Sequence, residues 1–377
     1  MALAVDQPWV EVSSSGALEL RDASTGHVAG RVAPGTAARV AADTLRAGLG
    51  LAAGADRREL GPMLEAVPAR GGTVRVGGTP YRGRVRLAWT APGRLAVVNV
   101  VPVEDYLAGV VPVEMGPVGV GAGDALKAQA VASRGYALLR VRQHAAFGFD
   151  LFAGEADQVY GGVSAETEAA RAAVRATRGE ILWSGGEPIE AFFHSTCAGR
   201  TAAADEVWRV PRRAYLAGVA DVDARTGAPW DAASPRSRWT VRWTAAELAR
   251  VLAPAIADSL GRAAGELRGL RVVSRGASGR VSGVEVSTAA GRVLLRGDAI
   301  RRVLRTPDAR PLYSTRFALA ITRGRDGRLA AVTAEGRGWG HGVGMCQFGA
   351  IGRARAGQDY RQILQAYYPG TRLERAY

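Results

Sequence analysis

A run of β-branched apolar residues at 97–101 is the clearest strand signal in the chain. A short run of this composition predicts a buried strand. Pro102 ends the run, because proline has no backbone N–H to donate. Glu104 and Asp105 follow, at positions where acidic side chains favour the first turn of a helix. The pattern therefore predicts a buried strand that leads directly into a short helix.

Glu114 follows this short helix and precedes Gly116-Pro117, a pair that interrupts regular structure. An alanine-rich segment at 124–140 then predicts a second helix, with its first aspartate as the N-cap. Lys127 and Arg134 are seven residues apart and lie on one stripe of that helix. We therefore expect Glu114 on a constrained loop between two helices, with a basic stripe nearby.

Short alternating segments characterise the first hundred residues. The pattern at 8–42 predicts short strands with a hairpin around Ser13-Ser14-Gly16. Residues 43–70 show no clear period, and a helix near 56–64 is the best candidate within them. Further strands are expected at 73–76, 81–89 and 94–100, separated by turns that contain glycine.

Helices and strands alternate through the rest of the chain. A helix is expected at 166–178 and a strand at 188–194. Thr244 and Glu247 have the spacing of a capping box, which predicts a helix to Val251. A strand meander, a helix starting after Asp298, and strands near 317–322 and 329–334 follow, and the last two are expected to lead back to the main domain.

Together these elements predict an α+β protein. A mixed sheet-and-helix main domain is interrupted by a small α+β subdomain inserted before the C-terminal segment. The predicted divisions are an N-terminal β-rich segment, a core, the inserted subdomain, and a glycine-rich segment that returns to the core, at 1–70, 71–220, 221–330 and 331–377.

Composition sets further bounds. The 377 residues are 47% apolar, enough for one large core or two smaller ones. No segment approaches eighteen uncharged apolar residues, so no membrane span is expected. The first residues, MALAVDQPWVEV, lack the basic region and apolar stretch of a signal peptide.

The net charge of +14 comes from 49 basic and 35 acidic side chains, and the basic ones are almost all arginine. Arginine, alanine and glycine all have GC-rich codons, so a compositional bias explains this charge without a specific ligand. Attraction to an anionic cell wall is the alternative. Nucleic acid is not expected as a partner, because zinc-finger spacing and blocks of arginine interleaved with aromatics are both missing.

Rare residues gather in three short segments. Lys127 is the only lysine. The only cysteines, Cys197 and Cys346, lie close to two of the four histidines, His194 and His341. The segments are 97–140, here called the first motif, AFFHSTCAGRTAAADEVW at 191–208, the second motif, and GRGWGHGVGMCQFGAIGRARAG at 336–357, the third motif, with YYPGT at 367–371 after it.

In this order the three motifs resemble the stage II sporulation protein D family, which also includes the amidase-enhancer proteins. The resemblance covers the chain from about residue 70 to the end. It implies a protein that acts on peptidoglycan, and in sporulation members a lytic transglycosylase. It also implies export to the cell envelope. The chain is then a mature or truncated form, has a misassigned start, or remains inside the cell.

The resemblance makes Glu114 the expected catalytic residue. Most glycosidases need two carboxylates. A lytic transglycosylase needs one, because the 6-hydroxyl of muramic acid attacks its own anomeric carbon and a single Glu can give and take the proton. Burial against Val111, Val113 and Met115 is expected to raise the pKa of Glu114. The alternative is a Glu that only caps a helix or pairs with Arg.

Several further residues are candidates for binding the glycan or orienting Glu114. Lys127 and Arg134 are the candidate cations, with an ion pair to Glu104 or Asp105 as the alternative. Glu114, Arg134, His194 and His341 are expected to converge on one cleft. The remaining candidates are polar or aromatic residues of the motifs and of one further segment: Gln129, Tyr136, Tyr160, Ser195, Thr196, Trp339 and Gln347. Core packing is the alternative for the aromatic residues.

The cysteines and motif histidines leave three alternatives open. His194, Cys197, His341 and Cys346 provide the ligand chemistry of tetrahedral zinc, and some members of the resembled family bind zinc. A Cys197–Cys346 disulfide suits an exported protein with two cysteines and is the preferred expectation. Two reduced buried cysteines are the third alternative. No cofactor is required by the predicted mechanism.

Three functions follow from these readings. The first is cleavage of peptidoglycan glycan strands to 1,6-anhydro ends. The second is a non-catalytic amidase enhancer that grips the wall and recruits or stimulates a separate peptidoglycan amidase. The third is a zinc hydrolase, which would need an open metal position and a base near His194 and His341.

Overall fold

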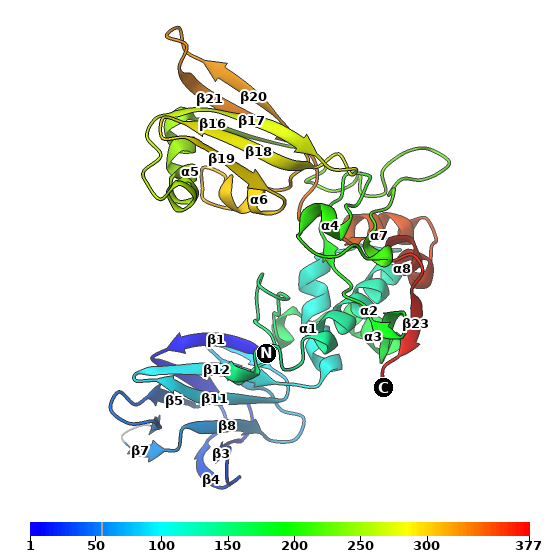
Figure 1. Ribbon diagram of the computed structural model, residues 1–377. Helices are drawn as coiled ribbons and strands as arrows, with labels where there is room; N and C mark the ends of the chain where they lie inside the picture. The colour runs from blue at the N-terminus through cyan, green and yellow to red at the C-terminus, as the bar shows by residue number, and fades with distance from the viewer. Residues whose placement is uncertain (54–55) are drawn as a thin grey trace.

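The computed structural model describes residues 1–53 and 56–377. It is an α+β protein with three main hydrophobic cores. Figure 1 shows two β-rich parts at opposite ends of the molecule and a group of helices between them. In the described part of the chain, no helix has the length and apolar character needed to cross a membrane.

The first β-rich part, here the N-terminal β unit, consists of two six-stranded sheets packed over one core. One sheet has the order β1-β12-β11-β8-β3-β4 and the other β10-β9-β2-β5-β6-β7. The strands are β1 Ala2–Gln7, β2 Trp9–Ser13, β3 Leu18–Asp22, β4 Val28–Val32, β5 Ala37–Ala42, β6 Leu49–Ala53, β7 Asp56–Leu60, β8 Met63–Pro68, β9 Val74–Val76, β10 Thr79–Tyr81, β11 Arg84–Ala91 and β12 Arg94–Val100.

Two sequence expectations change in this unit. The helix expected near 56–64 is wrong, because β7 and the start of β8 occupy that segment. The predicted boundary at residue 70 falls within the unit, since β11 pairs with β8 in antiparallel register, Val85 opposite Ala66. The strand predicted at 97–101 is β12, which pairs with β1 and β11 and is buried over most of its length.

The helical core follows β12 and contains most of all three motifs. Its helices are α1 Val103–Met115, α2 Gly123–Leu139, α3 Glu168–Ala176, α4 Ala204–Val207, α7 Gln347–Arg355 and α8 Tyr360–Tyr367. Short turns of 3-10 helix lie at Ala145–Phe147, Val163–Ala165 and Ala214–Leu216. The small sheets that complete the core are β14-β13-β23 and β15-β22, made of β13 Glu180–Ser184, β14 Glu187–Pro188, β23 Arg372–Arg375, β15 Phe193–His194 and β22 Met345–Cys346.

The second β-rich part, here the insertion, spans β16 to β21. Its elements are β16 Trp239–Thr244, α5 Ala245–Leu260, β17 Leu267–Arg275, β18 Val281–Thr288, β19 Arg292–Arg296, α6 Ala299–Val303, β20 Phe317–Arg323 and β21 Leu329–Gly336. The predicted capping box is present, with Thr244 and Glu247 bonded reciprocally. The helix runs on to Leu260, nine residues beyond the predicted Val251.

The strands predicted near 317–322 and 329–334 are present as β20 and β21, but they do not lead back to the main domain. Both belong to the sheet β16-β21-β20. Their apolar residues, among them Phe317 and Val332, pack in the core of the insertion. The chain therefore re-enters the helical core only after Gly336, at the third motif.

Candidate functional site

Glu114 lies in the last turn of α1, not on the predicted loop. The helix continues through Pro112 and ends at Gly116, which has a φ of 62°. The Gly116 N–H donates to the Pro112 carbonyl at 3.0 Å. Leu107, Val110 and neighbouring apolar residues are buried in the helical core, and this packing maintains the helix as far as Gly116, whose positive φ a glycine adopts without strain.

The carboxylate of Glu114 is half-buried and held by the backbone. Its Oε1 accepts a hydrogen bond from the Val159 N–H at 2.9 Å. Burial raises the pKa of Glu114, while the bond from Val159 and the nearby Gln347 side chain partly offset this shift. Of the predicted apolar neighbours, Val111 and Met115 are buried, but Val113 is 39% exposed.

Gln347 connects the first and third motifs. It is the first residue of α7, and its side chain lies close enough to the Glu114 carboxyl group to lower the pKa of that group. Its Nε2 also donates to Gln129 Oε1 at 3.4 Å, and Gln129 Nε2 donates to Ser133 Oγ at 2.9 Å. Gln129 is fully buried, so its place is behind Gln347, where it orients that amide.

Tyr136 is close enough to Glu114 for that charge to contribute, after burial and other neighbours, to the raised pKa of Tyr136. Its hydroxyl donates to Asp157 Oδ1 at 3.1 Å. The Arg140 guanidinium lies 3.6 Å from the centroid of the Tyr136 ring. The sequence does not single out Asp157 or Arg140. The only available signal was the nearby Tyr160, because the segment at 155–159 matches no motif.

Arg134 is not part of this arrangement, so the predicted convergence is wrong for this residue. Its guanidinium donates to both oxygens of Glu104, at 3.0 and 2.8 Å, and its side chain is fully buried. Glu104 precedes Glu114 by ten residues, about 15 Å along the helix. Remaining donors of Arg134 bind the carbonyls of Glu180 and Val174. The ion pair leaves no donor for a glycan.

Lys127 forms an ion pair with Asp124 at 3.1 Å and lies 5.8 Å from the ring centroid of Tyr360. Asp124 is in the first turn of α2, and the N-cap is Ala122, two residues before the predicted Asp124. Asp124 Oδ1 also accepts from the Tyr360 N–H at 3.2 Å. These contacts tie α2 to α8, and a glycan-binding role of Lys127 stays a prediction.

The two aromatic candidates differ in exposure. Tyr160 is buried, its hydroxyl donates to Asn99 Oδ1 at 3.0 Å, and its ring lies 5.1 Å from that of Tyr106. Tyr160 therefore packs in the core and does not present its face to a sugar. Trp339 is 42% exposed, with its ring centroid 6.1 Å from that of Tyr313. The Arg236 guanidinium lies over the Trp339 ring, 5.3 Å from its centroid, so stacking of a sugar on Trp339 stays a prediction.

The second and third motifs meet as two short parallel strands. β15 pairs with β22, placing His194 opposite Cys346. Before β22, glycines at 338, 340, 342 and 344 all have positive φ. A Cβ on Gly344 would overlap the Phe192 carbonyl oxygen. The alternating glycines therefore permit the close approach that brings the two motifs together.

His194 presents an unused nitrogen within this contact. Its Nδ1 lies 3.1 Å from the Val343 carbonyl oxygen. Since a carbonyl can only accept, Nδ1 carries the proton and Nε2 has a free lone pair. Nε2 is buried and has no hydrogen-bond partner in the described part of the chain. Burial, followed by the charges of His341 and Arg280, lowers the pKa of His194 well below its usual value.

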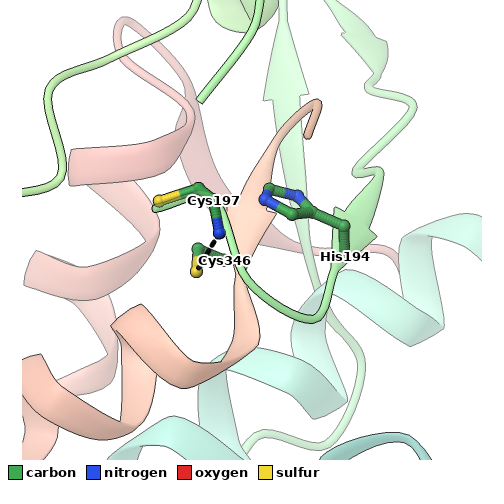
Figure 2. A group of neighbouring side chains, drawn as sticks. All are labelled: His194, Cys197 and Cys346. Carbon is green, nitrogen blue, oxygen red and sulfur yellow. Dashed lines mark hydrogen bonds between the residues drawn. The ribbon is translucent and has the colours of Figure 1, made fainter. Parts of the chain in front are cut away.

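The two cysteines are neighbours, as predicted, but they are free thiols, and the preferred disulfide is not formed. The Cys197 N–H donates to Cys346 Sγ at 3.2 Å, and Cys346 Sγ also caps α7 by accepting from the Gly349 N–H. Cys197 Sγ lies 3.2 Å from Asp221 Oδ2. Figure 2 shows the backbone nitrogen of Cys197 directed toward the sulfur of Cys346.

His341 is outside the close group, which contains only His194, Cys197 and Cys346, with ligand atoms within 4.8 Å of one another. The ring centroids of the two histidines are 5.5 Å apart. His341 Nδ1 accepts from the Val343 N–H at 3.1 Å, so its Nε2 carries the proton. The predicted four-ligand zinc set is therefore reduced to three residues.

Ser195 and Thr196 connect the second motif to the chain at 234. Thr196 is fully buried, and its Oγ1 lies 2.6 Å from Ser234 Oγ. Ser195 Oγ lies 3.1 Å from Thr196 Oγ1. Thr196 thus holds the second motif against the chain at Ser234 and is too deeply buried to contact a glycan. Ser195 is half-buried, and its glycan-binding role stays a prediction.

One polar site therefore contains Glu114, the Val159 N–H, Gln347 and Tyr136, with Asp157 and Arg140 behind them. A second group consists of His194, Cys197 and Cys346. Cys346 directly precedes Gln347 in the chain. The first group can hold a carboxylic acid in one orientation and transfer its proton. The second offers one imidazole nitrogen and two sulfurs, a ligand set that fits zinc.

Comparisons with known proteins match the same segments. A family model described as stage II sporulation protein matches residues 91–183, the segment that carries the first motif. A model for a domain of unknown function, DUF8618, matches residues 230–344, which include the insertion.

Three relatives align with most of the chain. An uncharacterised protein of Brachyspira hyodysenteriae is 32% identical over 279 residues, covering 74% of this chain and 68% of the relative. Stage II sporulation protein D of Bacillus subtilis is 31% identical over 298 residues, covering 74% and 76%. The amidase enhancer of Bacillus subtilis is 29% identical over 300 residues, covering 71% of this chain but 40% of that protein.

Proposed function

The chain belongs to the stage II sporulation protein family, and from this premise we propose that it cleaves the glycan strands of peptidoglycan in the cell envelope as a lytic transglycosylase. Glu114 is the proposed acid/base. The observation that supports this choice is its half-buried carboxyl group, held by the Val159 N–H and with a pKa raised by burial. A carboxyl group in this state retains its proton at higher pH than an exposed one.

In the proposed reaction, the protonated Glu114 donates its proton to the glycosidic oxygen as that bond breaks. The 6-hydroxyl oxygen of the muramic acid residue then bonds to its own anomeric carbon. The hydroxyl proton passes to the Glu114 carboxylate and restores the acid. Water is not consumed, and the products are a 1,6-anhydro end and a free 4-hydroxyl.

A second catalytic carboxylate is not needed in this reaction, and Asp157, two residues before the Val159 N–H that binds Glu114, is already engaged. The Asp157 side chain is 3% exposed. Its Oδ1 accepts from Tyr136, and its Oδ2 accepts from the Phe152 N–H at 2.8 Å. Arg140 lies 4.0 Å from the same carboxylate. These contacts favour a role for Asp157 in fixing Tyr136 over a role as nucleophile.

The test is mass spectrometry of purified peptidoglycan after digestion by the protein. The proposal expects muropeptides with 1,6-anhydro-muramic ends. Reducing ends in their place would indicate a hydrolase and contradict the intramolecular attack. A matched incubation with the Glu114→Gln variant identifies ends that were present before digestion.

The second candidate function is that of an amidase enhancer. The relative of that name supports it. In this case the residues around Glu114 bind the glycan, and the chemistry belongs to a separate amidase. Zymography on purified walls separates the two candidates, because an enhancer alone gives no clearing but increases clearing by an added amidase.

A zinc ion fits the group of His194, Cys197 and Cys346, because the His194 Nε2 lone pair has no other partner and two sulfurs lie nearby. These three residues would hold the metal, which would supply positive charge that stabilises the thiolates and joins the second motif to α7. The proposed proton transfers use Glu114 alone.

A further inference from the structure

A basic pocket lies at one edge of the insertion, separate from the residues around Glu114. It has a volume of about 480 Å³ and contains four arginines, at 238, 275, 316 and 337, beside Trp239 and Phe317. Each arginine stands at the end of a different strand: before β16, at the end of β17, before β20 and after β21. The sheet therefore gathers four positive charges at one edge, although they span one hundred residues of sequence.

The four charges are largely unbalanced. Glu335 is the only acidic residue that lines the pocket. None of the four guanidinium groups forms an ion pair within residues 1–53 and 56–377. Arg275 donates to the Phe317 carbonyl at 2.8 Å and Arg316 to the Ala198 carbonyl at 2.7 Å. These two are fixed by backbone groups that bring no negative charge.

The other two arginines, Arg238 and Arg337, are exposed, and neither side chain has a hydrogen-bond partner in the described chain. The pocket thus combines two anchored guanidinium groups with two that are free to reach a ligand. A guanidinium presents paired N–H donors whose spacing matches the two oxygens of a carboxylate or phosphate. This chemistry selects an oxyanion.

We propose that this pocket binds the carboxylate or phosphate groups of an anionic cell-wall polymer. The proposal rests on the proposed function only for the source of the ligand, the wall. The insertion then serves as an anion-binding module that holds the substrate beside the helical core. Arg316 makes this connection directly, because it also binds the backbone that follows Cys197.

The experiment measures binding of the protein to purified cell walls by co-sedimentation, with all proteins carrying Glu114→Gln to prevent turnover. Arg238→Ala/Arg337→Ala removes the two free arginines and leaves the anchored ones. Arg296→Ala/Arg325→Ala is the matched control, because both residues are exposed in the insertion and do not line the pocket. We expect binding to weaken about fivefold or more in the pocket variant only, with a flatter dependence on salt.

Three wall preparations identify the ligand: untreated walls, walls stripped of phosphodiester-linked polymers by acid, and walls stripped of stem peptides by an amidase. If the pocket and control variants bind acid-treated walls equally well, the ligand is phosphate. If they bind amidase-treated walls equally well, the ligand is carboxylate. Equal binding of the pocket and control variants to untreated walls would overturn the proposal. Binding of the protein to duplex DNA as tightly as to walls would overturn it as well. Failure of glycan cleavage by the unmodified protein would instead count against the proposed function.

Discussion

The backbone N–H of Val159 donates to Glu114 Oε1 at 2.9 Å, although the two residues are 45 positions apart. The bond fixes the carboxyl group against the segment that follows Asp157. Because the donor belongs to the backbone, side-chain substitution at 159 does not remove it. One oxygen of Glu114 is thereby anchored, which leaves the carboxyl group in a defined orientation for proton transfer.

Replacement of Glu114 by Gln is expected to reduce release of 1,6-anhydro products by at least ~100-fold, the usual contribution of a general acid. The amide has nearly the same shape and still accepts from Val159, so folding should be unchanged. Glu155→Gln is the control, because Glu155 is an exposed acid in the segment that leads to Val159. Turnover by Glu114→Gln close to that of Glu155→Gln would remove Glu114 from the mechanism.

The rate is expected to fall as the pH rises through the pKa of Glu114. Burial raises this pKa above the ordinary value of 4.5, so the acid form persists to higher pH than it does in an exposed Glu. Ionised Glu114 therefore lowers the free energy of unfolding. This loss begins above the ordinary pKa of 4.5, is complete above the raised pKa, and is absent at lower pH. Glu114→Gln should accordingly be more stable than the unmodified protein at about pH 8 and equal to it near pH 4. Thermal unfolding at the two pH values measures the difference, and the opposite sign would contradict it.

Arg134→Ala is expected to cost about 3–5 kcal/mol of unfolding free energy, because it leaves Glu104 largely buried without its partner. Arg175→Ala is the comparison, since Arg175 pairs with Glu168 on the surface and should matter little. Urea denaturation measures both. A variant at 134 with normal stability but weakened glycan binding would restore the substrate-binding role that the structure argues against.

Local patterns predicted most elements but not their partners. The strand β12, the capping box of α5 and the strands β20 and β21 follow from alternation and end signals. Alternation does not show to which sheet β20 and β21 belong, because the pairing of a strand is decided by non-local contacts. The same limit applies to Arg134. Its position on one face of α2 was predicted correctly. Its partner Glu104 is on α1, so it could be identified only from the packing of the two helices.

The loop predicted around Glu114 was wrong for a related reason. Pro112 and Gly116-Pro117 signal an interruption, whereas packing of the buried face of α1 carries the helix to Met115. In the candidate site, the motif residues Glu114 and Gln347 do meet. Asp157 could not be found, because its role depends on the fold that places it beside Tyr136.

The two motif histidines give the sharpest test of the metal site. His194 has a buried, unpartnered Nε2 in the group with Cys197 and Cys346. In His341, Nδ1 accepts from the Val343 N–H, and the proton on Nε2 leaves that nitrogen without a lone pair. A metal at this position should therefore depend on one histidine only.

We expect His194→Ala and Cys346→Ala to lose bound zinc, as measured by elemental analysis after purification in zinc-containing buffer, and His341→Ala to retain it. The rings of the two histidines lie close together, so His341→Ala controls for loss of packing at the same place. The unmodified protein should bind about one zinc per chain, and chelation should lower its melting temperature because metal binding is coupled to folding. Zinc-free unmodified protein after that purification, or equal loss of zinc in both histidine variants, would contradict the three-residue site.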